Sequence, residues 1–184
     1  MATTVVTYTR GSTYIKNVSH GKTCHGLVGW MVVGGLTFQT IERFSKEGLD
    51  FVHLKPKDYM SAVMYWHSKL GRVINPWQGT GPNHQQNNIL IHRGTKPSHF
   101  EGCIGPGFLD SKGSAFELTL SKASLELIWE TCGGVPDSKP GLSKNPLRVV
   151  FRVTNAFPDR STLMPKGGNP PAPTGQTDRM TPLR

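Results

Sequence analysis

The 184-residue chain lacks several features that mark common classes of small proteins. Its three cysteines, Cys24, Cys103 and Cys132, are odd in number and widely spaced. This spacing excludes a disulfide framework and suits a protein made in a reducing compartment. The longest apolar stretch, Gly26 to Leu36, covers about ten residues and is interrupted by glycines, which is too short for a membrane span. We therefore expect no segment that crosses a bilayer.

Metal motifs and a secretion signal are also missing. No Cys-x-x-Cys pair or His-Glu-x-x-His sequence occurs, so we expect no bound metal and no cofactor, although Cys24 and His25 lie near His20. The first residues have no basic region, no apolar core and no small-residue cleavage site. Classical secretion is therefore not expected.

The chain carries a large positive charge that is not clustered in the sequence. The net charge is +9, but the basic residues are spread from Arg10 to Arg184 without a run of five or six. No helix-turn-helix, zinc-finger or RNA-recognition motif accompanies them, so we do not expect sequence-specific nucleic-acid binding. Dispersed positive charge favours adhesion to a polyanion, for which a cell wall or its teichoic acids would serve as well as nucleic acid. The alternative is a solvated basic surface that aids solubility.

The residue pattern predicts a mainly β fold, a β-sandwich or a partly open barrel of short strands, with one substantial α-helix. Segments rich in β-branched and aromatic residues predict strands at 5–8, 12–15, 30–33, 37–41, 51–54, 59–65, 89–92 and 147–153. The helix is expected to start with Ser121 as its N-cap and to end at Gly133. Its residues Leu125, Ile128 and Trp129 fall on one face.

The chain length fits one domain with a core and a tail. We expect a single mainly β domain of catalytic type over residues 1–156. From Phe157 onward the sequence is rich in Pro, Gly, Thr and basic residues, and it lacks the apolar surface needed for a core. Residues 157–184 are expected to form either a disordered tail or a docking segment for a delivery apparatus.

One stretch carries residues suited to chemistry. An apolar run ends in His92, a turn is expected at Gly94, and Cys103 follows eleven residues after His92, between Gly102 and a predicted loop of Gly105, Pro106 and Gly107. Such a loop could display a thiol at the rim of a sheet. A nucleophilic cysteine needs a base such as imidazole, so His92 and Cys103 are the candidate pair. The alternative is a small buried cysteine and a histidine that ends a strand.

These residues carry a resemblance. The pair Ile91-His92-x-Gly94 and Glu101-Gly102-Cys103-Ile104 resembles the active-site motif of the L,D-transpeptidase catalytic domain, which cross-links or trims peptidoglycan through a cysteine acyl-enzyme. It is closer to a small phage- and secretion-associated family of uncharacterised function. In that family, an aromatic strand and a Ser-x-x-x-Arg turn precede the motif. The corresponding residues here are Tyr59, Ser68 and Arg72, and the similarity covers about residues 37 to 132.

The resemblance implies Cys103 as nucleophile, His92 as general base and the Arg93 carbonyl as the group that orients the imidazole. The transpeptidase motif has a histidine two residues before its cysteine, where this chain has Glu101, so His99 or Glu101 is expected to replace it. Gly105 stands where an arginine normally follows the Cys-Ile pair, and the His-to-Cys interval is short. The full expected site comprises, as catalytic residues, Cys103, His92, His99, Glu101 and Gly102, and, as substrate-binding residues, Arg93, Gly94, Ser98, Asn88 and Arg72.

The resemblance therefore implies a cysteine-dependent enzyme that transfers or hydrolyses acyl groups on peptidoglycan stem peptides, used by a phage or as a secreted antibacterial effector. Such a protein would be synthesised in the bacterial cytoplasm and reach the periplasm or cell wall by a non-classical route. A delivery apparatus, a phage component or an immunity protein would be its partners. The competing hypothesis is a non-enzymatic phage or secretion-apparatus component with a basic, polyanion-binding surface.

Overall fold

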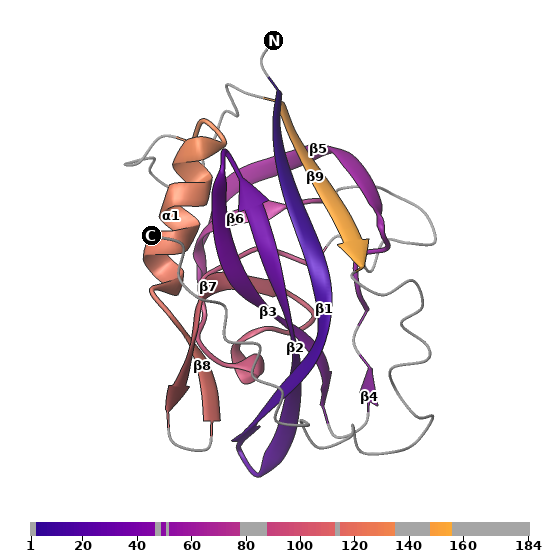
Figure 1. The fold of residues 1–184 in the computed structure, drawn as a ribbon, viewed down its shortest axis with the longest axis vertical. Helices are drawn as coiled ribbons and strands as arrows, with labels where there is room; N and C mark the ends of the chain where they lie inside the picture. Colours follow the sequence, from indigo (N-terminus) through magenta and orange to yellow (C-terminus); the bar gives the residue numbers. More distant parts are fainter. Residues whose placement is uncertain are drawn as a thin grey trace.

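The computed structural model describes residues 3–46, 49–50, 52–77, 88–112, 115–134 and 148–155. They form one nine-stranded sheet with a single α-helix beside it (Figure 1). The elements are β1 (Thr3–Ser19), β2 (Lys22–Val33), β3 (Leu36–Lys46), β4 (Leu49–Asp50), β5 (Lys57–His67), β6 (Gly71–Asn75), the 3₁₀ turn η2 (Pro97–His99), β7 (Ile104–Lys112), β8 (Ala115–Thr119), α1 (Ser121–Thr131) and β9 (Arg148–Asn155). The predicted tail 157–184 and the end of the predicted domain at 156 lie outside the described residues.

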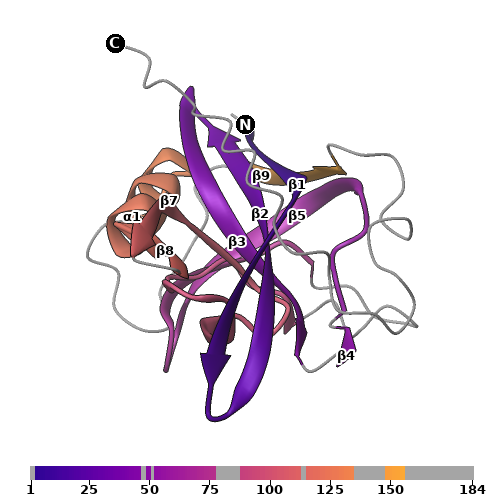
Figure 2. The same cartoon turned by 60° about the horizontal axis from the view of Figure 1, so that its bottom comes forward.

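The strands follow the order β6-β5-β9-β1-β2-β3-β7-β8, with β4 paired to β3. Strands β1, β2 and β3 are consecutive antiparallel neighbours, and β9 runs parallel to β1. The turns His20-Gly21 and Gly34-Gly35 join the first three strands. All four residues have positive φ, which is the backbone of the tight hairpin turns that match strand twist. The sheet is open, and α1 and β4 lie at opposite sides of it in both views (Figures 1 and 2).

The main core fills the inner face of the curved sheet. Alternate residues of the strands point into it, among them Tyr8, Met31, Phe38 and Phe151, as expected for strands with one buried face. Helix α1 adds Leu125, Ile128 and Trp129, the three residues whose spacing predicted an apolar face, and Cys132 packs beside them. The prediction of a mainly β fold with one substantial helix is confirmed.

A short segment around Ile91 links strands from distant parts of the sheet. Ile91 exchanges backbone hydrogen bonds with Ile74 of β6, at 3.1 and 2.8 Å. On its other side, Ile104 of β7 donates to the Leu90 carbonyl at 3.0 Å and accepts from the His92 N–H at 3.1 Å. These bonds hold residues 90–92 alongside the first residues of β7, which begins directly after Cys103.

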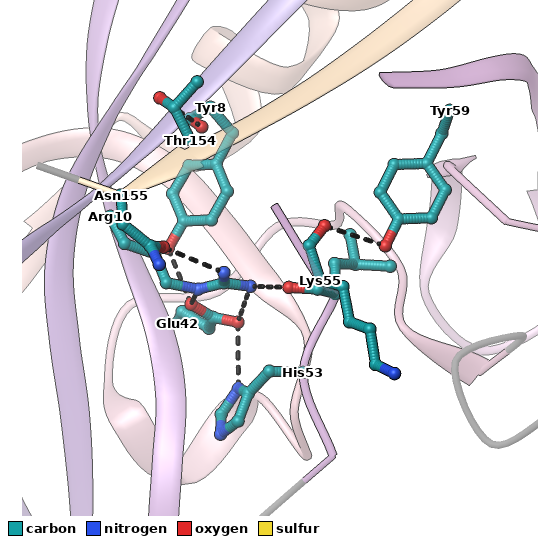
Figure 3. A network of polar contacts seen from close by, with 9 residues as sticks. Tyr8, Arg10, Glu42, His53, Lys55, Tyr59, Thr154 and Asn155 are labelled. Atoms are coloured by element: carbon teal, nitrogen blue, oxygen red, sulfur yellow. Dashed lines mark hydrogen bonds and ion pairs between the residues drawn. The ribbon is translucent and has the colours of Figure 1, made fainter. Parts of the chain in front are cut away.

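A buried ionic network joins β1, β3 and the segment that contains His53 and Leu54 (Figure 3). The Glu42 carboxylate accepts hydrogen bonds from the Tyr8 hydroxyl at 2.8 Å, from the Arg10 guanidinium and from His53 Nδ1 at 2.9 Å. Arg10 also donates to the Leu54 carbonyl at 2.6 Å. Because the hydrogen bonds satisfy a charge that would otherwise be costly to bury, this network is a structural element of the core.

Several local predictions need correction. The predicted strands 5–8 and 12–15 are one strand, β1, with a register irregularity between Arg10 and Tyr14. Val52 to Leu54 is not a strand, and in the predicted strand 89–92 only Ile91 makes isolated bridges, to Ile74 and to Ile104. Gly105, Pro106 and Gly107 lie in β7 rather than in a loop. Leu120 takes the N-cap position and Ser121 is the first helical residue, so the helix starts where predicted but with a different cap.

Candidate active site

His92 and Cys103 lie on the outer side of the sheet, opposite the main core. Side chains alternate along a strand, so Leu90 and His92 point outward where Ile91 points inward. The same alternation sends Ile104 into the main core and Cys103 into a separate outer cluster. The buried residues of that cluster are Ile15, Ile41, Val73, Leu90, Phe100, Cys103 and Leu118. The hydrogen bonds around Ile91 set Leu90 beside Cys103 and His92 beside Gly105, so the two candidate residues share a face.

The His92 ring is held in one tautomer. Its Nδ1 donates to the Arg93 carbonyl oxygen at 2.8 Å, the contact that the resemblance implies. With the proton on Nδ1, the neutral ring has a lone pair on Nε2. Burial lowers the pKa of His92, with a smaller opposing effect from the Arg93 hydrogen bond. His92 is therefore a neutral base at neutral pH, with 2% of its surface exposed.

Two neighbouring histidines are held differently. His67 Nδ1 accepts from the backbone N–H groups of Lys69 and Leu70, at 3.2 and 3.3 Å. His99 Nδ1 accepts from the Thr95 N–H at 3.1 Å. When neutral, both rings therefore carry their proton on Nε2. Of these three histidines, only His92 offers an Nε2 that can take a proton, which separates it from His99.

The Cys103 thiol is buried, with 6% of its surface exposed. Burial raises the pKa of Cys103, although the backbone N–H groups of Leu90 and Glu101 point toward the sulfur and lower it; the Leu90 nitrogen is 3.3 Å from Sγ. The thiol itself donates to the Asn88 carbonyl at 3.5 Å. The sequence-based expectation of an exposed thiol at a sheet rim is therefore wrong, because the outer cluster covers it.

The candidate pair, His92 and Cys103, is not hydrogen-bonded in this structure. Among the hydrogen bonds of the described residues, none joins His92 to Cys103; each uses a backbone carbonyl instead. Their backbone positions differ by two residues along the strand direction, which is roughly 7 Å. Leu90 is the residue set directly beside Cys103, and His92 is set beside Gly105.

Phe100, which was not among the predicted site residues, covers this face. Its ring centroid is 5.1 Å from that of His92. The ring also occupies the space above Gly94 and Gly105: a Cβ on Gly94 would be 2.5 Å, and one on Gly105 2.0 Å, from the ring. The Phe100 ring therefore leaves no room for a side chain at position 105. Gly94 and Gly105, on either side of Phe100 in the sequence, are the only local sign of this packing. That both glycines contact the Phe100 ring follows from the fold and not from the sequence.

The covering segment, residues 93–102, is attached to the body at several points. Asn17 of β1 makes two hydrogen bonds with Ser98, both of 2.9 Å. The Gly94 N–H donates to the Ser121 hydroxyl at 3.0 Å, and the Leu118 N–H donates to the Thr95 carbonyl at 2.8 Å. Ser98 and Gly94, predicted to bind substrate, thus hold this segment in place.

The remaining predicted residues have various surroundings. The Glu101 side chain is 79% exposed, with its carboxylate 3.9 Å from the Arg43 guanidinium. Gly102 has a φ of +82°, which favours glycine. Arg93 and Asn88 are exposed. Arg72 lies on the face of β6 opposite Val73 of the Cys103 cluster and pairs with Glu126 of α1 at 2.8 Å.

Comparisons with protein-family models, with curated proteins and with solved structures give no match. Within the part of the chain that the structure describes, no group of three or more His, Cys, Asp or Glu side chains could hold a metal ion. In the same residues, no helix combines the length and the apolarity needed to cross a membrane.

Proposed function

We propose that the protein is a cysteine acyltransferase or peptidase that acts on the stem peptides of peptidoglycan, with Cys103 as nucleophile and His92 as base. The observation that carries the proposal is the hydrogen bond from His92 Nδ1 to the Arg93 carbonyl. It leaves Nε2 able to accept a proton, on the same face of the sheet as a thiol. The substrate class rests on the resemblance of the motif to the L,D-transpeptidase domain.

The pair starts neutral. Burial raises the pKa of the Cys103 thiol and lowers that of His92, so both effects oppose a resting thiolate–imidazolium pair. The thiol proton therefore passes to His92 Nε2 as the sulfur attacks the amide carbonyl carbon. When the tetrahedral intermediate collapses, the C–N bond breaks and the leaving amine takes that proton from His92. A thioester on Cys103 remains.

The second half of the reaction reverses these steps. An amine or a water molecule attacks the thioester and gives its proton to His92, and the thiol recovers this proton as it leaves. An amine acceptor makes the protein a transpeptidase, and water makes it a peptidase. The N–H groups of Leu90 and Glu101, which point at the sulfur, are suited to stabilise negative charge that develops beside it.

Substrate must displace the Phe100 ring or approach from its edge, because this ring covers the face that His92 and Cys103 share. Exposed Asn88 and Arg93 flank the two reactive residues and are the proposed contacts for the peptide. Delivery to the cell wall by a phage or a secretion apparatus, through residues 157–184, belongs to the same proposal.

Mass spectrometry of muropeptides tests the chemistry. We expect the wild type to release or exchange stem-peptide residues of purified peptidoglycan, and Cys103→Ser and His92→Ala each to abolish this activity. The double variant should be little worse than either single variant, because members of one catalytic unit are not additive. Cys24→Ser is the matched control, since Cys24 is also a buried thiol but lies outside the outer cluster. Unchanged muropeptides with folded wild type, for tetrapeptide and pentapeptide stems, would reject the proposal.

A second candidate is a non-enzymatic structural or binding protein of a phage or secretion apparatus. The specific observation in its favour is the burial of Cys103 in an apolar cluster, which is the ordinary environment of an inert cysteine. On this hypothesis Cys103→Ala changes stability but no chemistry is lost. The muropeptide experiment distinguishes the two candidates.

A further inference from the structure

The outer side of four neighbouring strands carries a regular set of exposed and half-buried side chains next to the candidate site. Cross-strand pairing aligns them in two rows over β9, β1, β2 and β3, the strands that lie side by side in Figure 1. The first row is Arg152, Thr7, Val32 and Thr37, and the second row is Thr154, Thr9, Trp30 and Gln39. We call these eight residues the outer platform.

Trp30 is the main apolar group of the outer platform. Its side chain is on the solvent side of a central strand and is 42% exposed, and Val32 beside it is also exposed. Trp30 and Val32 point to the same side of β2 and form a short apolar strip, and tryptophan is a residue type that is enriched at binding surfaces because it combines a large apolar ring with an N–H donor. This face is therefore suited to bind a ligand that has an apolar surface.

The polar members of the outer platform define the kind of ligand. Thr7 and Thr37 offer hydroxyls, each able to donate and to accept, and Gln39 offers an amide. The Thr9 hydroxyl is hydrogen-bonded to the Thr154 hydroxyl at 2.9 Å, so it offers a ligand its acceptor capacity. Gln39 accepts from the Leu109 N–H at 2.6 Å through its side-chain oxygen, so its NH₂ group can still donate. The single charge in the two rows is Arg152 at the margin, and Asp58 pairs with it at 2.8 Å.

This combination matches a glycan. A pyranose ring has an apolar face of C–H groups, which packs on the electron-rich face of an aromatic ring, and hydroxyls at its edge, which exchange hydrogen bonds with neutral polar side chains. A polyanion or an acidic peptide would require free cations in the rows, and a protein partner would favour a larger apolar centre.

The outer platform is continuous with the Cys103 cluster. Two residues beyond Trp30 on β2 lies Val28, and two residues beyond Gln39 on β3 lies Ile41; each step is roughly 7 Å along a strand. Ile41 belongs to the cluster that contains Cys103 and Phe100, and Val28 packs against it. If one sugar of a glycan chain lies on Trp30, the next sugar therefore lies at the edge of the segment 93–102, which covers the Cys103 thiol.

We propose that the outer platform binds the glycan strand of peptidoglycan, with Trp30 stacked on an amino-sugar ring, and so directs the attached stem peptide toward Cys103. This inference rests on the proposed function for its choice of polymer. It assigns substrate binding to residues of β1, β2 and β3 that lie apart from the His92 and Cys103 motif.

The test measures binding without catalysis. Full-length Cys103→Ser protein is incubated with insoluble peptidoglycan stripped of teichoic acids, and bound protein is measured after sedimentation. The same protein is titrated with soluble N-acetylglucosamine oligomers while tryptophan fluorescence is followed. We expect both probes to bind, and Trp30→Ala in the same background to weaken binding about tenfold, with partial recovery in Trp30→Phe. Leu127→Ala, which removes an exposed apolar side chain of α1, is the matched control and should bind normally.

Each outcome is decisive for the outer platform. Failure of folded Cys103→Ser to bind either probe, or equal binding by Trp30→Ala, overturns the inference. Binding only to walls that retain teichoic acid also overturns it, because that result indicates a polyanion. If Trp30-dependent binding is found but wild type leaves muropeptides unchanged, the glycan surface stands and the proposed chemistry fails.

Discussion

The Phe100 ring occupies the space that a side chain at position 105 would need. A Cβ built on Gly105 would lie 2.0 Å from the ring, and neighbouring His92 packs against the same ring with a centroid separation of 5.1 Å. One aromatic side chain therefore couples the backbone after Cys103 to the orientation of the candidate base. This coupling explains why glycine follows the Cys-Ile pair.

Adding a methyl group at position 105 should disturb the fold and the site together. We expect Gly105→Ala to destabilise the protein by about 1–3 kcal/mol, the usual range for overpacking, because the Phe100 ring must move. Urea unfolding measures the change. Phe100→Leu alone should also destabilise the protein, but the double variant should be more stable than the sum of the two effects predicts, because the smaller side chain relieves the clash. Strict additivity would show that the clash is relieved elsewhere.

The pH dependence of activity should reveal a neutral catalytic pair. Burial lowers the pKa of His92 below its usual 6.5, so the ring stays unprotonated and competent further into the acid range. Burial raises the pKa of the Cys103 thiol, so the thiol does not titrate in the acid range where His92 does. We expect the acid limb of kcat/KM for the wild type to have its midpoint below pH 6.5, and His92→Gln, which removes the base, to lose activity at every pH. A midpoint above pH 7 would mean that the pKa of His92 is raised rather than lowered, and would contradict this mechanism.

The mainly β fold with one helix could be predicted from the sequence, because the alternation of apolar and polar residues and the turn-forming residues are local features. The inward face of α1 at Leu125, Ile128 and Trp129 follows from helical spacing alone. Strand β7 was missed because Gly105, Pro106 and Gly107 have low strand propensity. Their pairing with Ile41, Thr40 and Gln39 is a long-range contact that overrides local preference.

The candidate site was only partly predictable for the same reason. An apolar run ending at His92 and a glycine before Cys103 are local features. The run forms isolated bridges at Ile91 rather than the predicted strand, and it places His92 on the same face as Cys103. The burial of Cys103 depends on Phe100, Ile41 and Leu118, which lie on three different segments. The outer platform was equally invisible, since Trp30 and Gln39 become neighbours only through strand register.

Thiol labelling should be slow at neutral pH. We expect native Cys103 to react with iodoacetamide more slowly than a free thiol, with its reaction increasing only above the ordinary thiol pKa, because burial raises the pKa of Cys103 and limits access. Burial raises the pKa of Cys132 to about 12, so Cys132 should stay unmodified while the protein is folded. Mass spectrometry of peptides after timed labelling gives the rates, and denatured protein supplies the control. Rapid labelling of Cys103 at pH 6 would contradict the structure.

Acid should destabilise the protein through Glu42. Burial alone would raise the pKa of this carboxyl, but the Arg10 guanidinium and His53 outweigh that effect and hold it well below its usual range. A depressed folded-state pKa contributes stability above the unfolded value of about 4.3 and loses it as pH falls further. At pH 7, Glu42→Gln should cost about 3–5 kcal/mol of unfolding free energy, because Arg10 is left buried without its counter-charge. It should also flatten the pH dependence of the unfolding free energy below pH 4.

Asp58→Asn, which breaks an exposed arginine pair, is the control and should change the unfolding free energy little. Equal urea midpoints for wild type and Glu42→Gln at pH 7 would show that the network contributes no net stability.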